Sequence, residues 1–285
     1  MLRGETGFEN YYSSLFPGRW AELKKSLMED TKHAAVTFPG CTTYFLDPAS
    51  VCASLCLPVS NAGHVLDLCA APGGKTLVIS ANLSSDADMK SNERSPDRKK
   101  RLAKVIEDSL PESISSRISV SCSDGATMCR NENQKYGSIL LDAPCSSERH
   151  VMKDPKYLSQ WSPARLKNLA TEQWALASSA WRMLENGGFL LYATCALSPK
   201  ENDEIILRLT KKFEGALIQD MDVLEKTFSE NLSSALSKNI EIKSLSEKSI
   251  EEIFRCAEPT GCGMHVLPDT SGGYGPLYFS LIKKQ

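Results

Sequence analysis

The sequence has no long apolar run, no excess of charge of one sign and no internal repeat. None of its apolar stretches approaches the roughly 20 residues that a membrane-spanning helix needs, and residues 1–10 lack the apolar centre of a secretory signal. Lys and Arg number 33 against 35 Asp and Glu, a net charge of −2, so no overall positive field would hold a nucleic acid. We therefore expect a cytoplasmic chain, or alternatively a mitochondrial one, without membrane association.

Closely paired cysteines are also missing, although the chain has ten cysteines in 285 residues. A chain of this length can build its own core, so we expect reduced thiols rather than a disulfide framework. No C-x-x-C pair occurs, and the closest spacings, Cys52 with Cys56 and Cys256 with Cys262, have no companion cluster. The four histidines are widely spread as well, and we expect no metal site.

Short apolar runs alternate with longer helical patterns from about residue 64 onward. The runs predict strands at residues 64–68, 118–121, 138–141 and 189–193. Between them Ser95-Pro96, Ser162-Pro163 and Ser198-Pro199 predict helix starts, and Glu201 would complete a capping box with Ser198. This alternation predicts a doubly wound α/β fold, whose mostly parallel sheet is covered by helices on both faces. Ligands of such folds bind beyond the carboxyl ends of the strands.

Two segments depart from the alternating pattern. Residues 1–60 start with apolar residues at helical spacing, interrupted by Pro17 and Gly18, and predict a helical N-terminal extension. The α/β domain would then span residues 61–285. Residues 220–253 are polar, rich in Ser and Lys and weakly periodic, and we expect them to form an excursion from this domain with little functional signal.

The first predicted strand runs into a turn of small residues, D-L-C-A-A-P-G-G-K-T at residues 67–76. Such a turn lets the backbone approach a ligand, and the N-terminus of the following helix favours negative groups, as in nucleotide-like cofactor sites. The string is neither G-x-G-x-x-G nor G-x-x-x-x-G-K-[ST], which weakens dinucleotide and triphosphate interpretations. A tight turn without a ligand is the structural alternative.

Carboxylates follow the next two strands. Glu93 could accept both hydroxyls of a ribose, with Arg98 five residues on, or it could be a solvent-facing loop charge. Asp124, followed by Gly125, could accept a hydrogen bond from an exocyclic amine, although Asp-Gly is also a common turn dipeptide.

Two cysteines lie just past the ends of the fourth and fifth strands. Cys145 belongs to I-L-L-D-A-P-C-S-S, and Cys195 to L-L-Y-A-T-C-A-L-S-P-K-E-N. Lone buried cysteines are usually inert, but these two would lie together at the ligand edge of the sheet. Cys195 also precedes the helix expected from Pro199, whose N-terminal dipole would favour a thiolate.

Together these strings resemble the S-adenosylmethionine-dependent RNA cytosine-C5 methyltransferases. The resemblance also includes F-P-G-C-T-T-Y-F-L-D-P-A-S and the terminal G-P-L-Y-F-S-L-I-K-K, and it extends from about residue 38 to 284. The tail and the short chain look most like the short mitochondrial rRNA methyltransferases. The resemblance implies a seven-stranded Rossmann-like methyltransferase sheet, S-adenosylmethionine as cofactor, and RNA as substrate, with rRNA favoured over tRNA.

The resemblance assigns cofactor contacts to Ala70, Ala71, Pro72, Gly73, Gly74, Lys75, Glu93, Arg98, Asp124, Gly125 and Asp142. Within this set Glu93 would hold the ribose with support from Arg98, and Asp124 with Gly125 would meet the adenine. Asp142 would lie between the cofactor and the target base. The catalytic residues would be Cys195 as the nucleophile, Cys145 in product release, and Asp142.

Thiol chemistry explains this set. Addition of the Cys195 thiolate to C6 of cytosine turns the C4–C5 region into an enamine that can attack a sulfonium methyl group. Asp142 could relieve the electron density at N3 if burial keeps its carboxyl protonated. Cys145 could act as acid or base in the final elimination. The base must be unstacked, which implies single-stranded or flipped-out RNA.

Two helix faces carry the basic residues that could contact RNA phosphates: Arg98, Lys99, Lys100, Arg101 and Lys104 on one, and Arg19, Lys24 and Lys25 on the other. The second face would place the N-terminal extension, residues 1–60, on the RNA side. Solvated charged surfaces are the alternative interpretation. Because the total charge is nearly neutral, a protein or ribosomal partner could supply RNA affinity. Two rival functions remain, a noncatalytic S-adenosylmethionine-binding partner protein and a DNA cytosine methyltransferase in which Cys145 would be the nucleophile.

Overall fold

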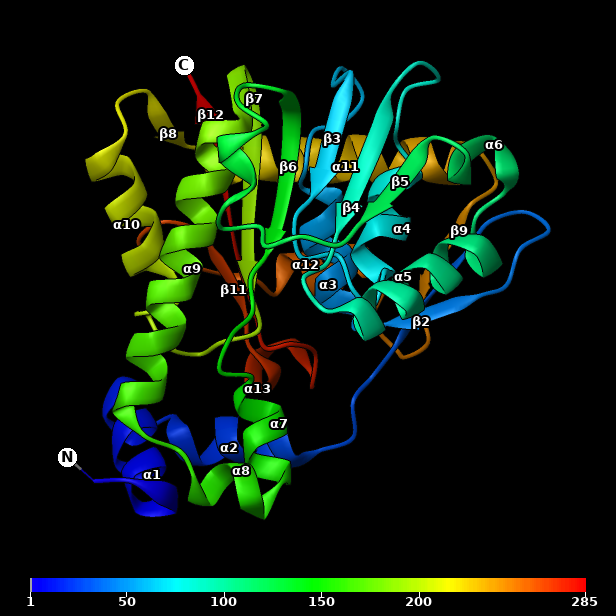
Figure 1. Cartoon of the computed structure of the whole chain (residues 1–285). Helices are drawn as coiled ribbons and strands as arrows, with labels where there is room; N and C mark the ends of the chain where they lie inside the picture. The colour runs from blue at the N-terminus through cyan, green and yellow to red at the C-terminus, as the bar shows by residue number, and fades with distance from the viewer. Residues whose placement is uncertain (1) are drawn as a thin grey trace.

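A central sheet lies between two layers of helices in the computed structural model, which describes residues 2–285 (Figure 1). Its strands follow the order β10-β11-β12-β7-β6-β3-β4-β5, and β8 pairs with β12. Parallel pairing runs from β7 through β6, β3 and β4 to β5, whereas the pairs that involve β8, β10, β11 and β12 are antiparallel. The strands of this sheet are β3 (His64–Asp67), β4 (Asp88–Asn92), β5 (Ile118–Ser121), β6 (Tyr136–Asp142), β7 (Leu184–Thr194), β8 (Ala216–Ile218), β10 (Glu258–Pro259), β11 (Met264–Val266) and β12 (Leu277–Lys284).

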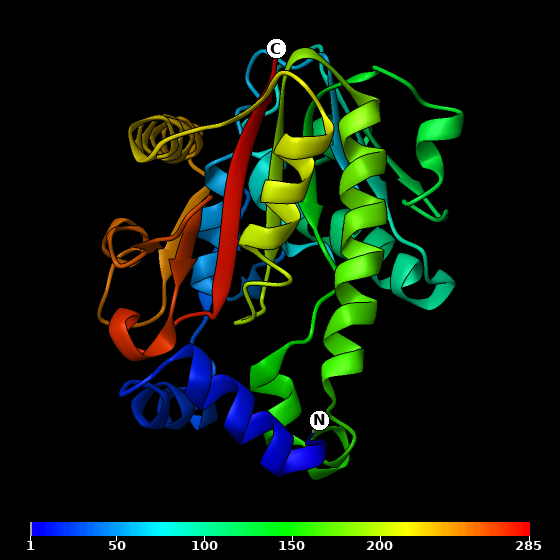
Figure 2. The same cartoon turned by 90° about the vertical axis from the view of Figure 1, so that its left-hand side faces the viewer.

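Helices cover both faces of the sheet, as the edge-on view shows (Figure 2). The α9 and α10 helices pack on one face, and α3, α4, α11 and α12 cover the other. No helix within residues 2–285 is both long and apolar enough to cross a bilayer. The helices are α1 (Gly4–Leu15), α2 (Trp20–Met28), α3 (Pro48–Leu55), α4 (Gly74–Ser80), α5 (Pro96–Ser109), α6 (Glu112–Ser115), η1 (Met128–Arg130), α7 (Glu148–Lys153), α8 (Pro155–Ser159), α9 (Pro163–Met183), α10 (Asp203–Lys212), α11 (Met221–Ser237), α12 (Ile250–Arg255) and α13 (Pro268–Ser271).

Alternating apolar residues bury the central strands on both sides. Val65 and Leu140 belong to the core on the α3 side, whereas Leu66 and Leu141 belong to the core on the α9 side. This two-sided burial is typical of parallel sheets and confirms the doubly wound prediction. The expected number of seven strands is wrong, because the sheet has nine within residues 2–285. The two extra edge strands, β8 and β10, are short and largely unburied, so no apolar alternation marks them in the sequence.

Two of the three predicted helix starts are confirmed. Ser95 caps α5 by accepting from the backbone N–H of Arg98, and Ser162 caps α9 in the same way. The start predicted at Ser198-Pro199 is wrong, because α10 begins at Asp203. Ser198 bonds to Tyr11 at 2.7 Å instead of capping, and the carboxyl of Glu201 is buried in a separate hydrogen-bond network. Tertiary partners therefore replace the local capping box.

The N-terminal helices α1 and α2 pack with α7 and α8 below the sheet (Figure 1). Aromatic side chains fill this small core, and Tyr12 stacks on Trp20 with ring centroids 5.4 Å apart. The first 60 residues also hold two strands that the sequence does not predict, β1 (Ala34–Thr37) and β2 (Tyr44–Leu46). The domain boundary at residue 60 stays a prediction.

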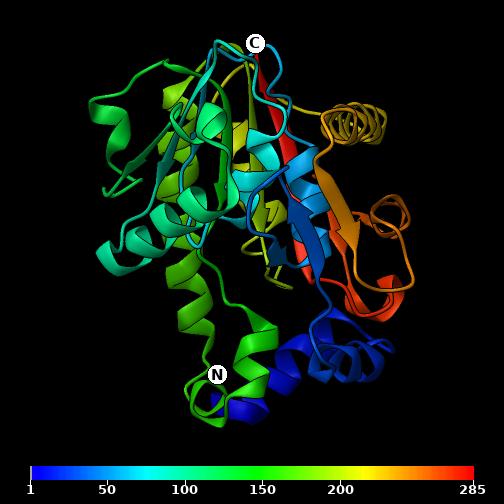
Figure 3. The ribbon, with the colours of Figure 1, turned by 90° about the vertical axis from the view of Figure 1, so that its right-hand side faces the viewer.

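Residues 220–253 are integrated into the fold, so the expected excursion is wrong. They form α11, β9 (Glu241–Ser244) and the start of α12, and β9 pairs with β1 in a three-stranded sheet (Figure 3). Phe228 of α11 stacks on Phe254 of α12 with ring centroids 4.2 Å apart. The polar composition conceals a buried stripe at four-residue spacing, Leu224, Phe228 and Leu232, that packs into the main core.

Candidate active site

Three hollows lie along the carboxyl ends of the parallel strands. The cysteine hollow, of about 430 Å³, contains Cys195, and the turn hollow, of about 140 Å³, lies at the turn after β3. These two share Lys75 and Asp142. The Glu93 hollow, of about 180 Å³, shares Cys69 with the turn hollow. The three hollows thus follow one another along the edge where a doubly wound fold binds ligands.

The turn between β3 and α4 needs its glycines for internal packing. Gly73 has a φ of +124°, and a Cβ there would come within 2.9 Å of Val105 on α5. A Cβ on Gly74 would meet the ring of Tyr44 at 2.8 Å. The turn hollow is lined by Ala70, Ala71, Pro72, Gly74 and Lys75, whereas Gly73 lines none of the three hollows. Tight packing therefore accounts for Gly73, while its neighbours form a concave surface.

The Glu93 hollow brings together Glu93, Arg98, Asp124 and Gly125, four residues singled out in the sequence. Glu93 is only 4% exposed, and its Oε1 accepts from the backbone N–H of Ser95 at 2.9 Å. Its Oε2 lies 3.0 Å from Arg98 Nη1 but receives no hydrogen bond of good geometry. A buried acceptor without a donor is costly, so this oxygen suits a ligand hydroxyl.

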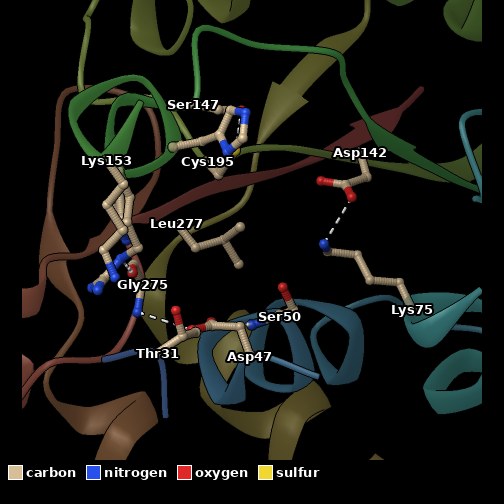
Figure 4. Close-up of a pocket in the computed structure, with 13 residues that line it drawn as sticks. Thr31, Asp47, Ser50, Lys75, Asp142, Ser147, Lys153, Cys195, Gly275 and Leu277 are labelled. Carbon is tan, nitrogen blue, oxygen red and sulfur yellow. Dashed lines mark hydrogen bonds and ion pairs between the residues drawn. The ribbon is translucent and has the colours of Figure 1, made fainter. Parts of the chain in front are cut away.

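Lys75 and Asp142 form an ion pair of 2.7 Å between the turn and the cysteine hollow (Figure 4). Burial disfavours the charged lysine, but the Asp142 carboxylate outweighs this effect and raises the pKa of Lys75. The side chain of Asp142 is 31% exposed. Asp142 is thus partly exposed and lies beside an ammonium group, and the protonated carboxyl hypothesised from the sequence stays a prediction.

The two cysteines meet at the cysteine hollow. Cys145 Sγ lies 2.8 Å from Cys195 Sγ, and the hydroxyl of Ser147 lies 3.2 Å from Cys195 Sγ. The hydrogen bond to Cys195, together with burial, raises the pKa of the Cys145 thiol well above its usual value. Cys145 therefore stays protonated, and Cys195, which lines the hollow, is the sulfur that a ligand in the hollow can reach.

The support expected for the Cys195 thiolate from a helix dipole is absent. Since α10 begins at Asp203, its N-terminus does not follow Cys195 directly, and the dipole acts only near the first turn. The stabilising groups are instead the Cys145 thiol, the Ser147 hydroxyl and the charge of Lys75, which interacts with Cys195. These three groups come from other parts of the chain.

Several lining residues carry no role in the sequence interpretation. Asp47 and Ser50 of α3 line the cysteine hollow opposite Cys195 (Figure 4). They lie in the F-P-G-C-T-T-Y-F-L-D-P-A-S string, which was the available signal. Arg149 donates to the carbonyls of Gly273 and Gly275, each at 3.1 Å. No local pattern predicts that contact, since the partners are more than 120 positions apart in sequence.

The basic helix faces expected to meet RNA are partly neutralised. Arg19 pairs with Glu258 at 2.6 Å and with Asp269, and Lys24 pairs with Glu9. On α5, Lys104 pairs with Asp108 at 3.1 Å. The basic residues that line the cysteine hollow are different ones, Lys75 of α4 and Arg149, His150 and Lys153 of α7.

Comparisons with known proteins agree with this architecture. The family model of the 16S rRNA methyltransferase RsmB/F matches residues 54–257. The mitochondrial tRNA (cytosine(34)-C(5))-methyltransferase of Mus musculus is 29% identical over 244 residues, 85% of this chain and 63% of that protein. Ribosomal RNA small subunit methyltransferase F of Escherichia coli K12 is 36% identical over 154 residues, 54% of this chain and 31% of that protein. This chain therefore spans less than two thirds of either relative.

A solved methyltransferase homologue from Pyrococcus horikoshii has the same fold, with a TM-score of 0.65 at 17% identity, covering 98% of this chain and 94% of that one. The resemblance to RNA cytosine-C5 methyltransferases inferred from the sequence is thereby confirmed at the level of the family. Since the matched region covers more than half of the residues and includes the turn and both cysteines, this chain belongs to the 16S rRNA methyltransferase RsmB/F family.

Proposed function

We propose that this chain is an S-adenosylmethionine-dependent RNA (cytosine-5)-methyltransferase. The observation that carries the proposal is the pair of thiols 2.8 Å apart beside a hollow of about 430 Å³ that also contains Lys75 and Asp142. A hollow of this size is adequate for a pyrimidine, since it lies in the usual range for small-molecule sites. Cys195 and the ion pair thus line one base-sized space, and the second thiol lies beside the Cys195 sulfur.

S-adenosylmethionine fits the two smaller hollows. Its ribose hydroxyls could donate to the free acceptor Oε2 of Glu93, and Asp124 could accept from the adenine amine. The amino-acid end would lie in the turn hollow along Ala70, Ala71, Pro72 and Gly74. When bound, the cofactor supplies an electrophilic methyl group on a sulfonium.

The chain's own residues then account for activation of the base. Cys195 would form a bond to C6 of the cytosine, and the electron pair moves toward C5 and N3. The Lys75–Asp142 ion pair holds a proton beside the hollow that can be given to N3 as the ring becomes electron-rich. The C5 proton would then pass to the Lys75–Asp142 pair, which has given a proton to N3, and the N3 proton is lost to water when the product leaves. Cys145, held as a thiol, would assist product release by donating a hydrogen bond to the Cys195 sulfur as its bond to C6 breaks and the thiolate returns.

RNA is the substrate class that we propose, with rRNA first because the matching family model describes rRNA methyltransferases. A specific observation makes tRNA the second candidate, since the relative matched over 85% of this chain acts, by its name, on tRNA. Arg149, His150 and Lys153 at the cysteine hollow would meet the phosphates that flank the unstacked cytosine. Two mitochondrial relatives, from Mus musculus and Danio rerio, support the mitochondrial location, which microscopy of the tagged full-length protein would test.

Covalent trapping tests the proposed function. Incubation with S-adenosylmethionine and RNA containing 5-fluorocytosine should give an adduct that survives denaturation, because fluorine blocks the final removal of the C5 proton. Matched transcripts of rRNA and tRNA, and DNA of the same sequence, identify the substrate. No adduct with any of the three would support a noncatalytic binding protein, and an adduct with DNA alone would support a DNA methyltransferase.

A further inference from the structure

Two buried carboxyl groups lie behind the cysteine pair, and the proposed chemistry does not use them. Glu148 is 1% exposed and Glu201 is fully buried. Buried acids are costly unless their oxygens are hydrogen-bonded. Here both groups accept hydrogen bonds from backbone amides, hydroxyls and a side-chain amide.

The hydrogen bonds of the two acids are reciprocal. Glu201 follows Cys195 in the chain, yet its Oε2 accepts from the backbone N–H of Ser146, the residue after Cys145, at 2.9 Å. Glu148 follows Cys145, yet its Oε2 accepts from the backbone N–H of Leu197, two residues after Cys195, at 3.0 Å. Each cysteine-bearing loop is thus held by a carboxyl that belongs to the other loop.

We propose that Glu148 and Glu201, here called the glutamate clamp, are positioning residues that set the separation of the Cys145 and Cys195 sulfurs. This inference rests on the proposed function for its catalytic meaning. The clamp touches neither sulfur directly, and it acts through the backbone of the two loops. Misplacement of a reacting group by about 1 Å can cost about a hundredfold in rate, so the separation of the thiols has a direct kinetic effect.

Two further contacts join the clamp to distant elements. Gln173 of α9 donates to Glu201 Oε2 at 2.9 Å and to the carbonyl of Pro144 at 2.8 Å. The hydroxyl of Tyr12, on α1, donates to Glu148 Oε1. The N-terminal helix is therefore part of the support of the two cysteines, in addition to any role as an extension on the RNA side.

The distance between the thiols can be measured without RNA or cofactor. Phenylarsine oxide binds two neighbouring thiols at once, and in the full chain its affinity should fall when the thiols separate. We expect Glu148→Ala and Glu201→Ala to weaken capture at Cys145 and Cys195 by about tenfold or more, with a parallel loss in the rate of adduct formation on 5-fluorocytosine RNA. Glu201→Gln, which retains a hydrogen-bond acceptor, should recover most of both losses.

Asp203 offers a matched control. It also accepts from backbone amides, Gly261 at 2.9 Å and Cys262 at 3.1 Å, but it joins α10 to the β10–β11 loop and not the two cysteine loops. Asp203→Ala should leave the arsenical capture and S-adenosylmethionine affinity within about twofold of the unmodified chain. Cys195→Ala identifies the capture signal, because it removes one of the two sulfurs.

The outcomes separate the two proposals. Equal arsenical capture by the clamp variants and by Asp203→Ala would overturn the clamp, as would a loss that Glu201→Gln does not repair. If an alanine variant fails to fold, Glu201→Asp, which is shorter by one methylene group, should show the same weakening of arsenical capture and the same loss in the rate of adduct formation. A chain that binds the arsenical normally but forms no RNA adduct would refute the proposed function and leave the clamp standing.

Discussion

At the Glu93 hollow each carboxylate is held by residues a few positions away, whereas at the cysteine pair the supporting bonds join segments far apart in the chain. Glu93 bonds to Ser95 and lies beside Arg98, but the cysteine loops depend on Tyr11, 187 positions from Ser198, and on Tyr12, 136 positions from Glu148. The Glu93 hollow, here called the binding end, can therefore be built from strand-end motifs alone. The pair of Cys145 and Cys195, here called the reactive end, needs long-range contacts, because two thiols that follow different strands must be held at a fixed distance.

Replacing each of the two thiols by alanine is the strongest test of the reactive end. Cys195→Ala should abolish adduct formation with 5-fluorocytosine RNA, because no other sulfur lines the cysteine hollow within residues 2–285. Cys145→Ala should still form the adduct with unmodified RNA and accumulate it, since release is impaired. Denaturing gel electrophoresis measures both, and the reverse pattern would assign the attack to Cys145 as in the DNA methyltransferase alternative.

The clamp also makes the stability of the protein sensitive to pH. Burial and the charge of Glu148 raise the pKa of Glu201 to about 7, above the roughly 4.3 of an unfolded chain. The folded protein therefore binds the extra proton, and its stability falls as pH rises between these values. In Glu201→Gln the loss of unfolding free energy with rising pH should be smaller by on the order of 3 kcal/mol. Urea unfolding of the unmodified chain and of Glu201→Gln at pH 5 and pH 8 measures the free energy of unfolding. An equal change in this free energy between the two pH values in both proteins would contradict the prediction.

At the binding end, Glu93→Ala should weaken S-adenosylmethionine binding without changing the thiol separation. Loss of a hydrogen bond to a charged acceptor costs about 1.5–3 kcal/mol, equivalent to about ten- to a hundredfold in Kd. Calorimetry measures the affinity, and arsenical capture tests the thiols. Asp97→Ala is the control, because this carboxylate lies on the same α5 helix with its side chain 86% exposed and forms only a surface pair with Lys100. Equal effects of both substitutions would remove Glu93 from the site.

The smallest expected effect concerns the local support of Glu93. Ser95→Ala deletes the cap of α5, which accepts from the N–H of Arg98 at 3.4 Å, and should cost about 1 kcal/mol in the free energy of unfolding. The backbone N–H of Ser95 still bonds to Glu93, so cofactor affinity should change little. Thermal unfolding and calorimetry measure the two quantities. A loss of affinity larger than the loss of stability would mean that the binding end also depends on contacts beyond its own motif.

Local pattern in the sequence predicted the central strands and two helix starts, and it placed candidate site residues at the strand ends. The predicted helix start at Ser198 was wrong because tertiary contacts replace the local capping box. Ser198 bonds to Tyr11, and Glu201 bonds to Ser146. Local pattern also failed where burial depends on partners elsewhere, as for Phe228 in a segment whose polar composition suggested an excursion. Edge strands β8 and β10 were missed because exposed strands carry no apolar alternation.

By itself the sequence determined that two cysteines and a glycine-bearing turn would lie at one edge of a parallel sheet, because strand ends follow from apolar periodicity and all parallel strands point the same way. Only the tertiary structure decided the distances between those groups and the charges and hydrogen bonds around them. The 2.8 Å separation of the thiols, the ion pair of Asp142 with Lys75 and the reciprocal bonds of Glu148 and Glu201 each join segments far apart in the chain. Such contacts depend on how distant segments pack, and no local pattern specifies them.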